Sequence, residues 1–182
     1  MENDASSAGV NLGGLFGIAE IKILLCYIFS TINEPIPANQ LANLLHYEGI
    51  ANGFEVSDAI VSLVKSGQLA LHDEKEDTYV ITDNGRNVAD TLNTSLSLTV
   101  KNRACAASIR MLSRFKNAKE TDIVTSKENG ATYVTCSLHD GQRPFMSIKV
   151  MVTDDDQARV IKESFLEDPA QIYKKIIEML TK

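Results

Sequence analysis

The sequence predicts an α+β protein: an N-terminal winged helix-turn-helix, a long connecting helix, and a C-terminal three-stranded antiparallel sheet covered by two helices. Three observations lead to this prediction. Apolar residues recur at helical spacing in three successive N-terminal segments. Two short strand-like segments follow these helices, as in the wing of a winged helix. Finally, Asn129-Gly130 and Asp140-Gly141 separate runs of alternating apolar residues, which is typical of hairpins.

The same pattern predicts how the chain is divided. Gly, Ser, Asn and Ala dominate the first residues, which therefore resemble a flexible lead-in. The expected segments are the lead-in at 1–17, the winged helix-turn-helix domain at 18–92, an amphipathic basic connecting helix at 93–119 and an α+β domain at 120–182.

Prolines and glycines delimit the three N-terminal helices. The first is expected over 18–31 and is ended by the Pro35-Ile36-Pro37 string, because proline cannot continue a helix. A short second helix stops at Glu48-Gly49. The third is expected over 53–66, with Asn52 as its N-cap and a glycine directly after it.

A polar loop predicts the wing. Segments 69–72 and 78–81 alternate like strands, and the five charged residues 73–77 join them at hairpin length. Thr82 is placed to cap a further helix that contains Gly85.

The connecting helix is expected over 95–116 and has two different faces. Its apolar positions are spaced by three or four residues: Leu96, Val100, Ala104, Ala107, Met111 and Phe115. Its other faces carry Lys101, Arg103, Arg110, Arg114 and Lys116. No acidic residue lies between Asn93 and Lys119, so this helix is the most basic part of the chain.

The C-terminal sheet is expected to bury one face, because Val134, Cys136 and Leu138 alternate with polar residues. The two final helices would cover it. Asp154-Asp155-Asp156 begins the first, and Asp168-Pro169 begins the second as cap and first helical residue. The residues expected to face the core are Ile161, Phe165, Ile172, Ile176, Met179 and Leu180.

Charge is distributed unevenly along the chain. The net charge is −6, which does not suggest a general polyanion binder. Residues 18–92 hold four basic and eleven acidic side chains, whereas residues 93–182 hold fourteen basic and eleven acidic ones.

Three isolated cysteines, an acidic start and the absence of a long apolar run predict a reduced, cytoplasmic protein without a signal peptide or membrane segment.

The string Tyr79-Val80-Ile81-Thr82-Asp83-Asn84-Gly85-Arg86 resembles the Tyr-x-Leu-Thr-x-x-Gly-Arg signature of winged-helix regulators of the PadR and MarR kind. The whole chain resembles an uncharacterised family of unknown function that is common in clostridia. The matching pieces are Ile21 to Ile28, Pro35-Ile36, Gln40-Leu41, Phe54, Leu63 to Gly67 and the Thr-x-x-Gly string. The resemblance implies a winged-helix DNA-binding or transcription protein with an α/β C-terminal part.

Two functions follow as hypotheses. The first is a homodimeric DNA-binding transcription regulator, in which the third helix approaches the major groove and basic residues contact phosphates. Its expected DNA contacts are Asn52, Gly53, Glu55, Ser57, Asp58, Ser62, Lys65, Lys75, Arg86, Lys101, Arg103, Arg110 and Arg114. The alternative is a protein–protein adaptor on a winged-helix scaffold, because the outer face of the third helix is acidic.

No catalytic, cofactor or metal site is predicted. The sequence contains no phosphate-binding glycine motif and no metalloprotease motif. His46, His72 and His139 lie apart from one another and from ligand-spaced partners. The acidic triplet at 154–156 is interpreted as a helix cap, and the protein is therefore not expected to be an enzyme.

Overall fold

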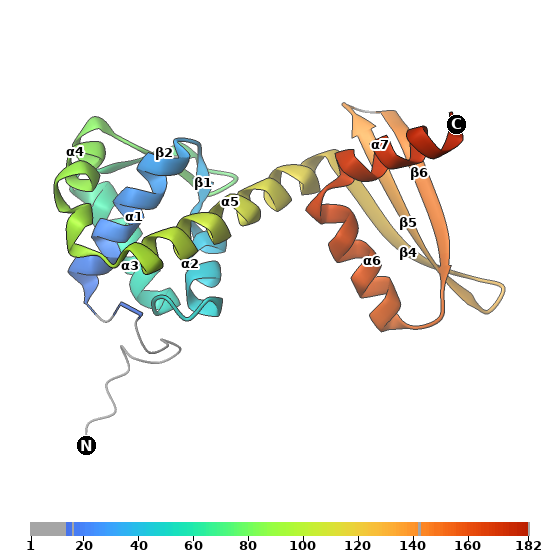
Figure 1. Cartoon of the computed structure of the whole chain (residues 1–182), viewed down its shortest axis with the longest axis horizontal. Helices are drawn as coiled ribbons and strands as arrows, with labels where there is room; N and C mark the ends of the chain where they lie inside the picture. Colours follow the sequence, from blue (N-terminus) through green and yellow to red (C-terminus); the bar gives the residue numbers. More distant parts are fainter. Residues whose placement is uncertain (1–13, 16, 142, 182) are drawn as a thin grey trace, which may run out of the picture. The chain divides into compact units, whose positions relative to one another are not determined.

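The computed structural model describes residues 14, 15, 17–141 and 143–181, and the chain forms two compact units (Figure 1). The first unit reaches Met111 and the second begins at Leu112. Each contains a three-stranded antiparallel sheet, and the predicted α+β class is confirmed.

The N-terminal unit contains mostly helices. Its elements are α1 (Ile18–Ile32), β1 (Ile36–Pro37), α2 (Ala38–Tyr47), α3 (Gly53–Lys65), β2 (Leu69–Asp73), β3 (Thr78–Ile81), α4 (Asp83–Leu92), a 3-10 helix (Asn93–Ser95) and the first part of α5 (Leu98–Glu120). The strand order is β1-β3-β2, with Ile36 opposite Tyr79 and Leu69 opposite Ile81. Three helices followed by an antiparallel hairpin is the element order of a winged helix-turn-helix.

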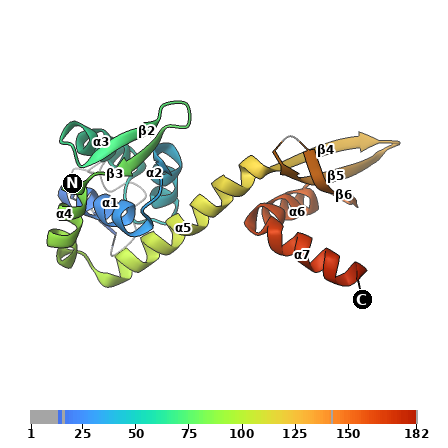
Figure 2. The same ribbon diagram turned by 90° about the horizontal axis from the view of Figure 1, so that it is seen from above.

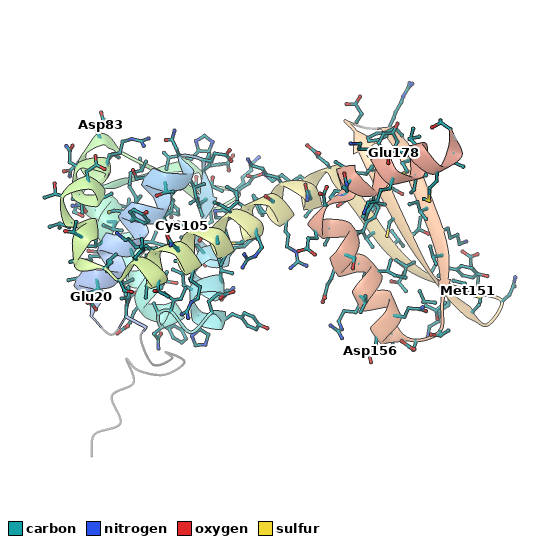
Figure 3. All side chains as sticks on the ribbon, viewed as in Figure 1. Glu20, Asp83, Cys105, Met151, Asp156 and Glu178 are labelled. Atoms are coloured by element: carbon teal, nitrogen blue, oxygen red, sulfur yellow. The ribbon has the colours of Figure 1, made fainter. Side chains whose placement is uncertain are left out.

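Helix α1 is the centre of the N-terminal core. Leu24, Leu25 and Phe29 are completely buried, and helices α2 and α3 add buried residues such as Leu41 and Val56. The helical spacing in the sequence therefore identified the buried faces correctly. In Figure 3, Cys105 of α5 lies among the helices of this unit, and it belongs to the same buried cluster.

The core extends further at both ends than the sequence predicts. Most of the expected lead-in, 1–17, lies outside the described residues. Leu15, however, is buried, and its N–H donates to the carbonyl of Ile50 at 2.7 Å, so this residue belongs to the core. Leu96, Val100 and Ala104 also join the N-terminal core, so the start of α5 packs within this unit as well as connecting it to the second.

The Thr-x-x-Gly string joins the wing to α4. The Thr82 hydroxyl donates to the carbonyl of Gly67 at 2.7 Å and accepts from the N–H of Gly85 at 3.2 Å, as a helix cap does. A Cβ on Gly85 would lie 2.3 Å from the carbonyl oxygen of Gln68. Glycine is therefore required by the close approach of α4 to the chain just before β2.

The C-terminal unit packs two helices on one side of its sheet. Its elements after α5 are β4 (Thr121–Glu128), β5 (Ala131–Asp140), β6 (Arg143–Val152), α6 (Asp155–Glu167) and α7 (Pro169–Leu180). The strand order is β4-β5-β6, as the two hairpin signals predict. Asn129 and Gly130 both have positive φ, 51° and 82°, which suits a tight two-residue turn. Val134, Cys136, Leu138 and Phe165 form the centre of its small core.

Aspartates cap both final helices, as expected. The Asp154 carboxylate accepts from the N–H of Gln157 at 2.7 Å, and the Asp168 carboxylate accepts from the N–H of Gln171 at 2.9 Å. The triplet at 154–156 thus begins α6, and Pro169 occupies the first turn of α7.

One prediction about a helix face and one about a helix start were wrong. Met179 and Leu180 were expected in the core, but 67% and 76% of their surfaces are exposed. The two last residues of α7 continue the apolar pattern beyond the part of the helix that the sheet covers. The long helix α5 also begins at Leu98 instead of Ser95, because the Ser95 hydroxyl donates to the carbonyl of Leu92 within the 3-10 turn.

Candidate interaction surface of the N-terminal unit

The turn between α2 and α3 places two helix ends against each other. Gly49, with φ of 63°, reverses the chain after α2, and the side-chain oxygen of Asn52 accepts from the N–H of Phe54 at 2.9 Å to start α3. A Cβ at Gly53 would lie 3.3 Å from Cβ of His46, which is tight. The glycine therefore lets the first turn of α3 lie close to the last turn of α2.

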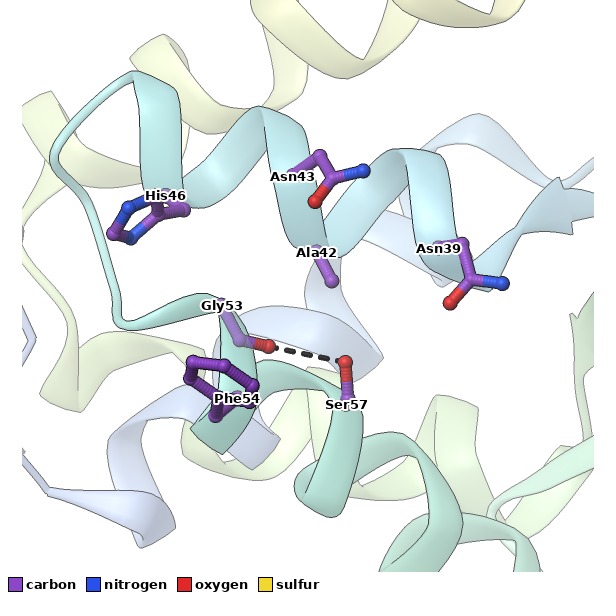
Figure 4. A pocket seen from close by; sticks show the side chains of 7 residues that line it. All are labelled: Asn39, Ala42, Asn43, His46, Gly53, Phe54 and Ser57. Atoms are coloured by element: carbon purple, nitrogen blue, oxygen red, sulfur yellow. Dashed lines mark hydrogen bonds between the residues drawn. The ribbon is translucent and has the colours of Figure 1, made fainter.

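A shallow groove of about 180 Å³ runs between these two helices (Figure 4). Its lining residues are Asn39, Ala42, Asn43 and His46 of α2 and Gly53, Phe54 and Ser57 of α3. The Ser57 hydroxyl donates to the carbonyl of Gly53 at 3.0 Å. No Lys, Arg, Asp or Glu lines the groove, so it offers amide, imidazole, hydroxyl and aromatic groups.

Two aromatic side chains on either side of the turn are exposed to an unusual degree. Phe54 is 86% exposed and Tyr47 is 88% exposed, and Val61 on α3 is half-exposed. Of the two, Phe54 lines the groove, and aromatic residues are enriched at interaction surfaces.

The charged groups around this surface are mainly acidic. Glu55 and Asp58 lie on α3, where Lys65 at the C-terminal end is the one basic residue. In the wing, the Asp73 carboxylate accepts from the N–H groups of Lys75 and Glu76 at 2.8 and 3.1 Å. The tip of the wing therefore carries four carboxylates and one ammonium group.

The wing charge also affects a tyrosine on β3. Burial raises the pKa of Tyr79 above its usual value, and a hydrogen bond to Asp77 and the charge of that carboxylate raise it further. Asp77 at the end of the wing loop therefore acts on the first residues of β3.

The structure places two of the expected DNA contacts in the interior. Asn52 is 6% exposed and its side chain caps α3. Lys101 is 8% exposed, and its ammonium lies 5.1 Å from the centre of the Tyr27 ring, a cation–π contact. These two residues therefore cannot present their side chains to a phosphate as expected. Arg86 is half-buried and donates to the Asn33 side chain at 2.5 Å.

The other expected contacts remain at or near the surface, in two groups. Those of α3 and the wing are Gly53, Glu55, Ser57, Asp58, Ser62, Lys65 and Lys75. Those of α5 are Arg103, Arg110 and Arg114, all exposed. Of these ten residues, the groove uses Gly53 and Ser57.

The sequence reasoning missed the aromatic and amide parts of this surface. Asn39, Asn43, Tyr47 and Phe54 were not identified as site residues, and His46 was identified only as an isolated histidine. One signal was present: Phe54 lies off the buried stripe of α3 that runs through Val56, Ile60 and Leu63. An aromatic residue off the buried stripe is expected to face solvent or a partner.

Among the described residues, no three His, Cys, Asp or Glu side chains lie together as a metal site. The cysteines Cys26, Cys105 and Cys136 are buried free thiols. Burial raises the pKa of Cys26 to about 11 and also raises the pKa values of the other two thiols. Thiols in this state are poor nucleophiles, because the thiolate is the reactive form.

The fold defines a protein with an N-terminal unit of winged-helix element order and a small C-terminal α+β unit. Residues 21–180 match the family described as Domain of unknown function (DUF4364), and the chain belongs to this family. No curated protein and no solved structure matches the chain. None of the helices in the described part of the chain is long and apolar enough to cross a membrane.

Proposed function

We propose that the N-terminal unit is a protein-interaction module on a winged-helix scaffold, and that the groove between α2 and α3 binds a partner segment. The observation that carries this proposal is Phe54, 86% exposed beside an uncharged groove in the first turn of α3. The expected partner segment inserts an apolar side chain beside Phe54 and carries positive charge toward Asp58 and the wing.

Electrostatics favours a protein partner over DNA at this surface. Lys and Arg contacts to phosphates dominate protein–DNA affinity, and specific binders make roughly six to ten of them. Helix α3 and the wing together carry two lysines, Lys65 and Lys75, among six carboxylates. By contrast, aromatic side chains are the usual anchors of protein interfaces, where each such anchor contributes on the order of 2 kcal/mol or more.

Replacing Phe54 tests this function. The full chain is immobilised and exposed to nuclease-treated native lysate, and captured proteins are quantified by mass spectrometry. Phe54→Ala is expected to reduce capture of the specific partner at least tenfold, since a tenfold loss corresponds to about 1.4 kcal/mol. Leu98→Ala is the matched control, because Leu98 is 66% exposed in the same unit but lies outside the groove. Equal recovery by the native chain and both variants would exclude the groove as the binding site.

A second candidate function is a homodimeric DNA-binding regulator, which two observations favour. Arg103, Arg110 and Arg114 are exposed along α5. In addition, Asn39 and Asn43 line the groove, and asparagine side chains pair with adenine edges in DNA recognition. Under this hypothesis α5 contributes the phosphate contacts that α3 lacks.

Charge reversal on α5 tests the second candidate. Binding to pooled genomic fragments is measured at low and at physiological salt. The DNA hypothesis predicts salt-sensitive binding that the double variant Arg110→Glu and Arg114→Glu weakens strongly. Phe54→Ala serves as the comparison variant, because it leaves every phosphate contact in place. Absence of salt-sensitive binding by the native chain would reject DNA binding.

A further inference from the structure

We infer that strand β6 and helix α7 form a homodimer interface, at which β6 pairs antiparallel with β6 of a second copy. This inference is independent of what the groove in the N-terminal unit binds. It rests on an open sheet edge, an apolar surface beside that edge and the charge pattern of the edge strand.

Strand β6 is a long edge of the C-terminal sheet. The order β4-β5-β6 leaves one side of this ten-residue strand without a neighbouring strand in the described chain. Such an edge presents a row of backbone N–H and C=O groups that match the same groups of another edge strand. Antiparallel pairing of two identical edges is self-complementary, as a two-fold interface requires.

The usual protection of an edge strand is weak here. Lysine on an edge normally discourages pairing, but the Lys149 ammonium bonds to the Glu128 carboxylate at 2.6 Å and lies 4.7 Å from the centre of the Tyr133 ring. Since Glu128 is on β4 and Tyr133 on β5, the lysine lies back across the sheet. Pro144 interrupts hydrogen bonding at the start of β6, which leaves 145–152 for pairing.

A bulge in β6 extends the apolar surface. Leu138 pairs with Met146 and His139 with Pro144, so Phe145 is an additional residue in the strand. Its ring contacts Tyr173 of α7 edge-to-face, with the ring centroids 5.3 Å apart, yet it remains half-exposed. The bulge therefore links the edge strand to α7.

Helix α7 leaves apolar side chains uncovered. Tyr173, Ile177 and Leu180 follow one another at helical spacing and become more exposed toward the C-terminus, and Met179 is exposed on another side of the helix. Figure 2 shows that the end of α7 lies farther from the sheet than its beginning. On β6, Val150 is exposed on the face that the helices cover, whereas Met151, labelled in Figure 3, is exposed on the opposite face.

The size and charge of this surface suit a second copy of the chain. Five of the exposed large apolar side chains lie on the helix-covered face of β6 or along one stripe of α7, and they offer an area on the order of several hundred Å². They are Phe145, Val150, Tyr173, Ile177 and Leu180. A standard interface buries about 800 Å² on each partner, so backbone pairing together with this surface reaches the required range. Lys149 pairs with Glu128 and Lys174 with Glu178 inside each protomer, so two of the four basic side chains of β6 and α7 are already compensated when two copies approach.

Sedimentation equilibrium of the full chain tests the inference. The native chain is expected at twice its 20.0 kDa mass. The double variant Ile177→Glu and Leu180→Glu is expected to sediment as a monomer at concentrations where the native chain is fully dimeric. Val160→Glu is the matched control, because Val160 is 53% exposed on α6 of the same unit, and it should remain dimeric.

Hydrogen exchange gives a second readout that distinguishes interface loss from unfolding. The amides of β6 are expected to exchange more slowly in the native dimer than in the double variant, while those of β5 remain equally protected in both. The inference would be overturned if the native chain were still monomeric at a concentration of about 0.1 mM. A dimer that survives the double variant with unchanged β6 exchange would also overturn it.

Discussion

The two units of the chain bury their apolar residues to very different extents. In the described part of the chain, the N-terminal cluster contains 25 buried hydrophobic residues, whereas the C-terminal cluster contains six. Helix α1 lies at the centre of the first core and is covered by neighbours from the same unit. The C-terminal sheet has helices on one face, and apolar residues of β6 and α7 stay exposed. The first unit therefore has the larger core, whereas the second combines a small core with an uncovered apolar stripe on α7.

This difference separates two kinds of exposed apolar residue. In the N-terminal unit, Phe54 and Tyr47 are exposed and lie outside the buried cluster, and the proposed function uses Phe54 for recognition. In the C-terminal unit, Ile177 and Leu180 extend an incomplete core, and covering them would stabilise the unit. Binding at either surface would stabilise the folded chain, but the groove would make stability depend on the concentration of the partner, whereas a homodimer would make it depend on the concentration of the chain itself.

The largest expected effect comes from truncating one aromatic residue in each core. Phe165→Ala in the C-terminal unit and Phe29→Ala in the N-terminal unit both remove a buried ring, at a cost of about 3–5 kcal/mol. We expect Phe165→Ala to unfold the small C-terminal unit, while Phe29→Ala leaves a folded unit of lower stability. Thiol labelling followed by mass spectrometry checks this, because Cys136 reports on the C-terminal core and Cys26 on the N-terminal core. Protection of Cys136 in Phe165→Ala would contradict the proposed difference between the cores.

The next effect concerns the contact between α4 and the wing. Gly85→Ala forces a Cβ to within 2.3 Å of a backbone oxygen, so the helix or the strand must shift. We expect a loss of about 1–3 kcal/mol in the free energy of unfolding of the N-terminal unit, measured by denaturant titration. Gly17→Ala is the control, because its nearest neighbour is a flexible side-chain atom at 3.7 Å. The unfolding of the C-terminal unit should not change.

These contacts show which features the sequence could predict. Caps and turns depend on residues a few positions apart, so Asn52, Asp168 and Asn129-Gly130 could be assigned from local sequence. Helical spacing likewise identified the buried face of α1. All of these features are determined within a single segment.

Features that depend on a second segment could not be predicted in this way. Lys101 was expected to contact DNA, but it is buried against the Tyr27 ring of α1. Leu180 continues an apolar stripe, but the sheet does not reach it. The groove needs α2 and α3 together, so its amide side chains carried no signal in either helix alone. Periodicity defines the face of a helix but not the neighbour that covers it.

A smaller effect is expected on the stability of the N-terminal unit at alkaline pH. Burial raises the pKa of Cys26 from 9.0 to about 11, so the folded state retains its proton at pH values where the unfolded state loses it. The stability that the protonated, buried Cys26 thiol contributes is therefore fully present below pH 9 and is lost as the pH rises toward 11. Two pKa units correspond to about 2–3 kcal/mol. The Cys26→Ala variant should be less stable than the native chain at neutral pH, but its free energy of unfolding should fall less between pH 9 and pH 11. The same fall with pH in both proteins would contradict the raised pKa of Cys26.

The smallest effect compares the N-caps of the two units at acid pH. The Gln157 N–H and the Thr153 hydroxyl hold the pKa of Asp154 below its usual value, whereas the equivalent cap of α3 is the uncharged Asn52. Because the folded pKa is lowered, the stabilisation from Asp154 is present above its ordinary value of 3.8 and is lost as the pH falls below it. Asp154→Asn keeps an oxygen that can accept the capping hydrogen bond but removes the titrating carboxyl group. The C-terminal unit of this variant should therefore lose less stability than the native unit between about pH 5 and pH 2, the range in which carboxylates titrate. Carbon-detected NMR titration of the carboxylates in the native chain measures the Asp154 pKa directly. A value at or above the ordinary one would mean that this cap does not contribute to acid sensitivity, and that the two helix starts differ in sequence but not in their response to pH.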